Sequence, residues 1–382
     1  MPSQPRIVAR RGTGWLLWGR LGSVVAGALV VSLVSWAVFG SEPETSPAPS
    51  AGSAPATRPP TARLPAVDRP DPTTTTPPPP TTTTKPAPPP GASLGGCPNL
   101  PAGDVWHAEV SKLPVHQRSA QYVASIGADR PVKADFGAGL WNGGPIGLPI
   151  TYVAGDQRRV PVTFEYADES DPGPYPVPRD AAVEGGPDSD GDRHVLVVDT
   201  AACRLYELFA ATPRADGSWH AGSGAVFDLR SHRLRPAGWT SADAAGLPIA
   251  PGLVRYEEVA AGRIDHAIRV TVPRSQRLFL WPARHAASDS SDPALPPMGL
   301  RLRLKPDVDL NSLPAQARIV AEAMKIHGVV VADNGAPWFI GGAPDSRWDN
   351  DALRALAALH GSDFEAVDTA PLMADPNSSR IR

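Results

Sequence analysis

The sequence predicts a mainly β fold with a few helices, an α+β ectodomain built as a sandwich or a barrel behind one transmembrane helix. Three observations support this prediction. Residues 21–39 are uncharged and mostly apolar, short strand-like segments alternate with Gly- and Pro-rich loops from residue 97 onward, and two segments have helical character. This pattern favours sheets that pack face to face or close on themselves over a helical bundle.

Residues 21–39 are predicted to be a transmembrane signal anchor. A helix of about 19 residues covers roughly 28 Å, close to the thickness of a bilayer core. Residues 1–20 contain four arginines, so they are expected to be a basic cytoplasmic tail, with the rest of this single-pass protein of the cell membrane outside. The alternative is a cleaved signal peptide, but the apolar segment is long and ends without a clean small-residue cleavage site.

Residues 40–96 are predicted to be a disordered stalk rich in Pro and Thr. Blocks of four Thr, four Pro and four Thr follow one another at 73–84. Such a segment buries too little apolar surface to offset its ordering entropy, so it should be extended and partly polyproline II. It is either a passive spacer or an O-glycosylated stalk that crosses a cell-wall layer. Residues 97–370 then form one β-rich extracellular domain, followed by a disordered tail at 371–382.

Composition and cysteine usage exclude several classes of function. The net charge is −3 at pH 7 and no basic cluster occurs beyond the cytoplasmic tail, which argues against nucleic-acid binding. Cys97 and Cys203 are expected to lie outside the membrane, where they most simply form a disulfide. We predict no metal and no cofactor, since zinc, phosphate-loop and dinucleotide motifs are absent from the sequence. A Gly-x-Ser-x-Gly elbow is also missing.

The predicted strands share either a continuous apolar run or an alternation of apolar and polar residues: 161–166, 194–199, 204–209, 267–272, 299–304, 329–332 and 338–340. The strand at 204–209 is expected to be the partner of the one before it, after a short connection. The last two strands flank Asp333-Asn334-Gly335, a strong hairpin signal. Helices are predicted at 314–327 and 349–360, because each has a typical first-turn residue and is followed by Gly.

The candidate catalytic residues are acids or histidines in loops or among apolar neighbours: Asp135, Glu207, Asp243, His266 and His285. Two carboxylates that face one cleft can act as acid and as base or nucleophile, as in glycosidases. A histidine held by a carboxylate is a common general base or metal ligand. Each residue also has a structural interpretation. Glu207 would then pair with an arginine such as Arg255 or Arg269, and Asp243 would cap backbone amides.

The candidate ligand-binding residues are aromatic or charged side chains of the same loops and strands: Trp141, Trp239, Arg255, Trp281 and Asp333. Trp239 opens a long irregular loop that ends at Pro248 and also contains Asp243, and loops on rigid scaffolds often carry sites. A separate acidic stretch, Asp188-Ser-Asp190-Gly-Asp192, resembles the start of a calcium loop. It lacks a Glu at the twelfth position, so a solvated acidic turn is favoured.

Long and unusual motifs run through the predicted ectodomain. The clearest is Tyr166-Ala-Asp-Glu-Ser-Asp-Pro-Gly-Pro-Tyr-Pro176, and the others lie at 97–127, 135–155, 192–208, 224–257, 281–285, 298–305 and 331–348. Together they resemble a family of large secreted bacterial ectodomains that has no established activity. The resemblance implies an extracytoplasmic location and one integrated domain. Asp104-Val-Trp106-His107 and Lys133-Ala-Asp135 stand where Asn-x-Trp-Asn and His-Pro-Asp would be expected, so roles of those polar groups do not carry over.

These observations predict a bacterial surface protein whose ectodomain acts on or binds an extracellular polysaccharide or the cell wall. If it is an enzyme, a glycoside hydrolase is favoured, because the candidate site residues are carboxylates beside aromatic rings. The alternative is a non-catalytic wall-binding or adhesion module. A metal-dependent hydrolase would require His266, His285 and an Asp within coordination reach. The sequence gives no indication of the oligomeric state.

Overall fold

The computed structural model describes residues 93–382, which belong to one compact unit. The predicted cytoplasmic tail, the signal anchor and nearly all of the stalk lie outside the described residues. Across 93–382, no helix has both the length and the apolar character to cross a membrane.

A four-stranded sheet contains the strongest strands predicted from the sequence. Its strands, in spatial order, are β12 (Ser223–Asp228), β9 (Arg204–Phe209), β8 (Val195–Asp199) and β6 (Ile150–Val153). Strands β8 and β9 are antiparallel, with Val195 opposite Leu208 and Asp199 opposite Arg204, which confirms the predicted pairing. Strand β6 runs parallel to β8 at one edge, and β12 runs antiparallel to β9 at the other.

The side-chain alternation of this sheet separates two apolar cores. Leu196 and Leu205 belong to the main core, whereas Val197 and Leu208 belong to a second, smaller core. A three-stranded sheet contributes Trp219 to the second core, and its strands are β10 (Thr212–Pro213), β11 (Trp219–Ala221) and β7 (Val162–Phe164). Because strand residues alternate between faces, Glu207 shares the main-core face with Leu205.

A six-stranded mixed sheet forms the centre of the main core. Its strands, in spatial order, are β17 (Phe364–Ala366), β14 (Arg301–Leu304), β15 (Val329–Asn334), β13 (Ile268–Val272), β16 (Phe339–Gly341) and β3 (Lys133–Asp135). Strand β13 pairs in parallel with β15 and antiparallel with β16, so it lies between them. The predicted hairpin of β15 with β16 is therefore wrong. Both main sheets are open at their edges, so the predicted barrel alternative is also wrong.

The helices cover one part of this sheet. The α-helices of residues 93–382 are α1 (Ser119–Ile126), α2 (Tyr256–Ala260), α3 (Ala315–Ile326) and α4 (Asn350–Arg354). Helix α3 confirms the predicted helix at 314–327. Helix α4 is shorter than predicted, because the chain tightens into a 3-10 helix at Ala355–Ala358. Its start is capped as expected, since the Asp349 carboxylate accepts hydrogen bonds from the backbone N–H groups of Asp351 and Ala352.

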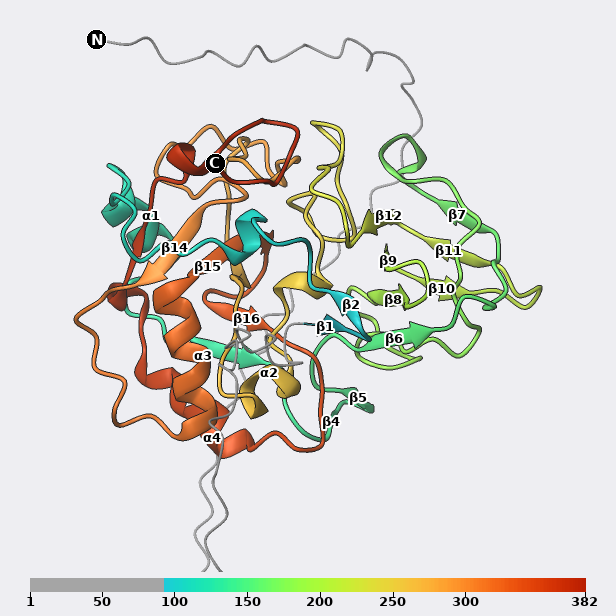
Figure 1. The fold of residues 1–382 in the computed structure, drawn as a ribbon, viewed down its shortest axis with the longest axis horizontal. Helices are drawn as coiled ribbons and strands as arrows, with labels where there is room; N and C mark the ends of the chain where they lie inside the picture. Colours follow the sequence, from blue (N-terminus) through green and yellow to red (C-terminus); the bar gives the residue numbers. More distant parts are fainter. Residues whose placement is uncertain (1–92) are drawn as a thin grey trace, which may run out of the picture. The chain divides into compact units, whose positions relative to one another are not determined.

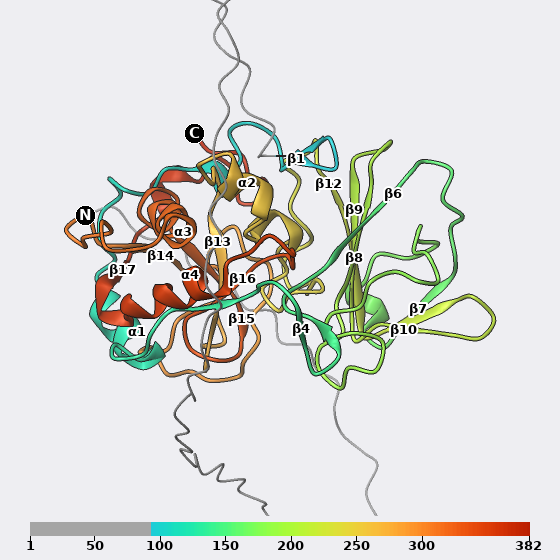
Figure 2. The same ribbon diagram turned by 90° about the horizontal axis from the view of Figure 1, so that it is seen from below.

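The two sheet regions lie side by side. In Figure 1 and in the perpendicular view of Figure 2, strands β6 to β11 occupy one side of the molecule, and α3, α4, β14 and β15 occupy the other. Two small hairpins complete the described strands, formed by β1 (Ser93–Leu94) with β2 (Cys97–Pro98) and by β4 (Leu140–Trp141) with β5 (Gly144–Pro145). The strand-rich, mixed architecture agrees with the predicted α+β class.

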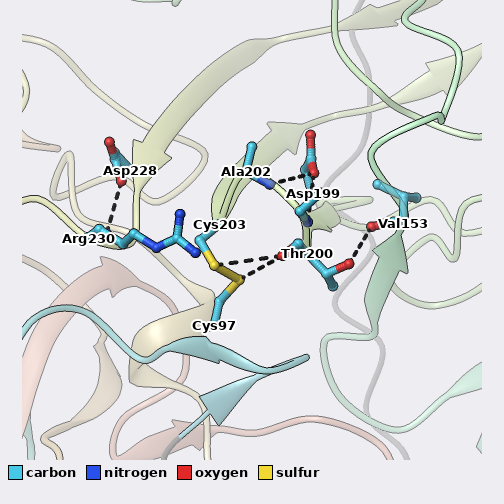
Figure 3. Close-up of a disulfide and its surroundings, with 9 residues drawn as sticks. Cys97, Val153, Asp199, Thr200, Ala202, Cys203, Asp228 and Arg230 are labelled. Atoms are coloured by element: carbon cyan, nitrogen blue, oxygen red, sulfur yellow. Dashed lines mark hydrogen bonds between the residues drawn. A yellow bond between two sulfur atoms is a disulfide. The ribbon is translucent and has the colours of Figure 1, made fainter.

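The predicted disulfide is present. Cys97 and Cys203 are bonded with an S–S distance of 1.98 Å, and both residues are buried. The bond joins the β1–β2 hairpin to the turn between β8 and β9, where the Thr200 carbonyl lies against both sulfur atoms (Figure 3). It therefore ties the start of the described chain to the four-stranded sheet, across a sequence separation of 106 residues.

The C-terminal residues, predicted to be a disordered tail, are instead part of the fold. The Val105 N–H donates to the Ser379 carbonyl at 2.8 Å, and the Trp281 indole N–H donates to the Ser378 carbonyl at 2.8 Å. The Ser379 hydroxyl donates to the buried Asp104 carboxylate. Hydrogen bonds to residues far away in the sequence hold this segment in place. The composition of the segment alone does not indicate these partners.

Candidate functional site

A pocket of about 230 Å³ lies beside strand ends from both main sheets. We call it the Asp333 pocket. Its lining is polar and aromatic and comprises Tyr166, Asp192, Phe209, Ser223, Thr240, Ser241, Ala242, Ala244, Asp333 and Asn334. Phe209 ends β9 and Ser223 begins β12, and Asp333 and Asn334 end β15. The loop predicted to carry a site contributes Thr240, Ser241, Ala242 and Ala244.

The Asp333 carboxyl has an unusual environment for an acid. Partial burial and the nearby negative charge of Asp243 raise its pKa to about 7, although the positive charges of Arg269 and His194 oppose the rise. The Asn334 N–H donates to one of its oxygens at 2.7 Å. Asp333 is thus partly protonated at neutral pH and can donate a proton inside a pocket, which is the requirement for a general acid.

Asp243 and Arg269 form a bidentate ion pair next to this carboxyl. Arg269 donates from Nη2 to Oδ1 of Asp243 at 2.7 Å and from Nε to Oδ2 at 3.1 Å. Asp243 has no exposed surface. Its role at the site is therefore indirect, since its charge acts on the Asp333 carboxyl and its carboxylate does not line the pocket.

Glu184 and His194 form a second ion pair near the pocket, in which His194 is buried and Glu184 is half-buried. The Nδ1 atom of His194 lies 2.6 Å from a Glu184 carboxylate oxygen, and Nε2 lies 2.9 Å from the carbonyl of Ala242. Burial lowers the pKa of His194, but the hydrogen bond and charge of Glu184 outweigh it and raise the pKa to about 9. The imidazolium therefore donates from both ring nitrogens and fixes Ala242, which lines the pocket.

Glu207 is held by the backbone and not by an arginine. The N–H groups of Ile249 and Ala250 donate to its carboxylate at 2.9 Å, and the residue has no exposed surface. Burial raises its pKa to about 7, against the effect of these two hydrogen bonds. Arg269 and Arg255, the two partners considered from the sequence, bind Asp243 and Glu258 instead.

Asp135 lies at the end of β3 and is exposed. Loss of hydration and the charge of Glu184 raise its pKa, while Arg269 and Lys133 oppose the rise. No hydrogen bond joins Asp135 to Glu207 in residues 93–382, so the two carboxyls are not in direct contact. Charge–charge interactions instead connect both carboxyls to one charged cluster. The cluster comprises Asp135, Glu184, His194, Glu207, Asp243, Arg269 and Asp333. Shifted pKa values concentrated in one cluster are typical of functional sites.

The two histidines predicted from the sequence lie in different environments. His266 is fully buried, with Nε2 3.1 Å from the Glu258 carboxylate, so it belongs to the core. His285 is partly exposed, with Nδ1 2.8 Å from the carbonyl of Ala244 and Nε2 3.9 Å from the carboxylate of Glu169. The structure does not bring the two histidines into contact. In the described part of the chain, no group of three or more His, Cys, Asp or Glu residues could hold a metal ion.

Of the predicted ligand-binding residues, some line pockets and others pack against the rest of the fold. Asp333 lines the pocket described above, and Trp239 lines a second pocket. Trp281 is half-buried against the C-terminal segment, and Arg255 is buried and donates to the Ala250 carbonyl at 3.2 Å. Trp141 is 73% exposed on the small β4–β5 hairpin, so it is the one ring of the set that is largely open to solvent.

Sequence reasoning considered Asp192 only as part of the acidic stretch at 188–192, and not as a residue of the candidate site. It belongs to the acidic turn at 188–192, yet it lines the same pocket as Asp333. Its carboxylate has no hydrogen bond or ion pair with any residue in 93–382. The acidic stretch and its position in a loop just before the buried strand β8 were the available signals, because loops on a rigid scaffold often carry site residues.

Comparisons with known proteins gave no match to a family model, a curated protein or a solved structure.

Proposed function

We propose that this chain is a membrane-anchored, extracytoplasmic glycoside hydrolase that cleaves an extracellular polysaccharide in the Asp333 pocket. One observation carries the proposal: Asp333, whose pKa is raised to about 7, lines the same pocket as a second carboxylate, Asp192, that has no partner in residues 93–382. A carboxyl with a raised pKa beside a second carboxyl in one pocket is the arrangement that glycosidic bond cleavage requires.

In this reaction Asp333 protonates the oxygen of the leaving sugar. Asp192 either attacks the anomeric carbon directly or activates a water molecule, depending on the separation of the two carboxyls. Burial and the nearby Asp243 carboxylate raise the pKa of Asp333 to about 7, so part of the protein keeps this carboxyl protonated near neutral pH.

The rest of the lining suits a sugar. Tyr166 and Phe209 offer aromatic surface, and Thr240 and Ser241 offer hydroxyl groups.

The test is product release from a panel of bacterial-envelope and plant polysaccharides by the full chain, measured by mass spectrometry. We expect D333N and D192N to lower the rate by about a hundredfold or more, the usual effect of losing a positioned acid or base. D188N is the matched control, because Asp188 lies in the same acidic turn as Asp192 but does not line the pocket. Equal rates for the wild type and D333N would contradict the proposal.

A second candidate is a non-catalytic wall-binding module. It is favoured by the fact that Glu207 and Asp243 are occupied by backbone amides and an arginine, respectively. Retention of the protein on one polysaccharide, with no released product from the wild type, would favour this class.

A further inference from the structure

A second and larger pocket, of about 430 Å³, lies beside the ends of β12 and β9. We call it the arginine pocket. Its lining is rich in charged and aromatic side chains and comprises Asp171, Arg204, Val226, Phe227, Asp228, Ser231, Arg233, Leu234, Arg235, Pro236 and Trp239. The volume falls in the range of about 300–1,000 Å³ that is common for small-molecule sites.

One of its three arginines is fully engaged by the protein. Arg235 is buried and pairs with the carboxylate of Asp171. It also donates to the carbonyl oxygens of Thr240 and Glu169, both at 2.8 Å. Its guanidinium lies over the rings of Phe227 and Trp239, 5.8 and 5.5 Å from their centroids. Arg235 therefore fixes an aromatic wall and neutralises Asp171.

The other two arginines are free. The side chains of Arg204 and Arg233 are exposed and form no hydrogen bond or ion pair with any residue in 93–382. Asp228 is opposite Arg204 in the β9–β12 register, but its carboxylate accepts a hydrogen bond from the backbone N–H of Arg230 at 2.9 Å. Two unpaired guanidiniums beside an aromatic wall form a site for an anionic group attached to a body with a flat apolar face.

The two pockets are joined by the chain itself. Trp239 lines the arginine pocket, and the next residue, Thr240, lines the Asp333 pocket. Arg235 links them further, because its Nε donates to the Thr240 carbonyl. Consecutive residues therefore line the two pockets, and this adjacency is the basis for considering one polymer in both.

We propose that the arginine pocket binds an acidic sugar unit, bearing a carboxylate or a phosphate, of the polysaccharide on which the Asp333 pocket acts. Arg204 and Arg233 bind the anionic group, and the ring of Trp239 packs against the sugar. The polymer connection rests on the proposed function, whereas the anion site stands on the free guanidiniums alone. A neutral polymer would leave both guanidiniums unpaired.

The experiment is isothermal calorimetry on the full chain carrying D333N, which prevents turnover. The probes are trigalacturonate for a carboxylate source, a short glycerol phosphate oligomer for a phosphate source, and neutral maltotriose. We expect one acidic probe to bind at least about tenfold more tightly than maltotriose. R204A and R233A should each weaken it by about tenfold, the usual effect of losing a charged hydrogen bond. R230A is the matched control, since Arg230 is an exposed arginine near this pocket that does not line it, and it should change affinity by less than about twofold.

The outcomes separate this inference from the proposed function. Equal affinity for acidic and neutral probes, or unchanged affinity in the R204A/R233A double variant, would overturn the inference. Tight binding of the glycerol phosphate oligomer alone would support it and identify phosphate as the anionic group. If the wild type releases no product from any polysaccharide while the acidic probe still binds through Arg204 and Arg233, the proposed hydrolysis fails and the anion site stands.

Discussion

Replacing Asp333 with Asn should stabilise the protein at high pH. The pKa of Asp333 is raised from its ordinary 3.8 to about 7 in the folded state, by burial and by the charge of Asp243. A carboxyl whose pKa is raised on folding contributes stability that is complete below the unfolded pKa and is lost as pH rises through the folded pKa. Above pH 7 the wild type must therefore carry an unfavourable ionised carboxylate, whereas Asn stays neutral and has nearly the same shape.

The size of the effect follows from the two pKa values. Their difference corresponds to about 4 kcal/mol in the free energy of unfolding. Asp333 is partly exposed, so screening by solvent should reduce the observed effect to about 2 kcal/mol. Asn can still accept the 2.7 Å hydrogen bond from the Asn334 N–H, which limits other losses.

The assay is chemical denaturation of the wild type and D333N at several values between pH 4 and pH 9. The difference in unfolding free energy should be small near pH 4 and should grow in favour of D333N up to pH 8. D188N, at an exposed acid, is the control and should give a small, nearly constant difference. A D333N variant that is less stable than the wild type at pH 8, or a difference independent of pH, would refute the reasoning.

Three further predictions concern the groups around the site. D243A should lower the free energy of unfolding by about 3–5 kcal/mol in urea denaturation, because it leaves a buried arginine without its partner; a loss below about 1 kcal/mol would mean that the pair is not structurally important. Replacing Cys97 and Cys203 with Ala should cost about 4–5 kcal/mol from loop closure over 106 residues, and a calorimetric scan with unchanged Tm would contradict this. H194Q should be less stable than the wild type at pH 6. The difference in unfolding free energy should narrow as pH rises through about 9, because the imidazolium then loses the proton that favours its pair with Glu184. A difference that widens with pH in denaturation curves would contradict a raised pKa of His194.

The local sequence pattern was sufficient to predict the strongest strands, but it was insufficient to predict how strands far apart in the sequence pair with each other. The apolar run before Asp199 and the alternation after Arg204 predicted β8 and β9, because those strands bury their own side chains next to each other in sequence. The Asp333-Asn334-Gly335 turn predicted a hairpin, yet β13 lies between the two flanking strands. A local turn signal does not reveal a strand that enters from 60 residues earlier, since strand order depends on long-range burial.

The candidate site was predictable in part for a related reason. A charge among apolar neighbours indicated that Glu207 has a partner, while Asp243 was chosen from an irregular loop and His266 from its position before a strand. Core hydrogen bonds and catalysis produce the same patterns. The structure places all three in the core. Asp333 and Trp239 do line pockets. Residues that line pockets from exposed turns and strand ends were missed, because tertiary structure and not local pattern decides where such side chains lie; they include Asp192, Arg204 and Arg233.

The pH dependence of oligosaccharide release by the wild type, D333N and D192N tests the central claim most directly. The wild-type rate should fall as pH rises above about 7, where Asp333 loses its proton. D333N should be slower by about a hundredfold or more and should lose this alkaline decline. A D333N enzyme that releases products at the wild-type rate with the same pH profile would contradict the assignment of Asp333 as the acid.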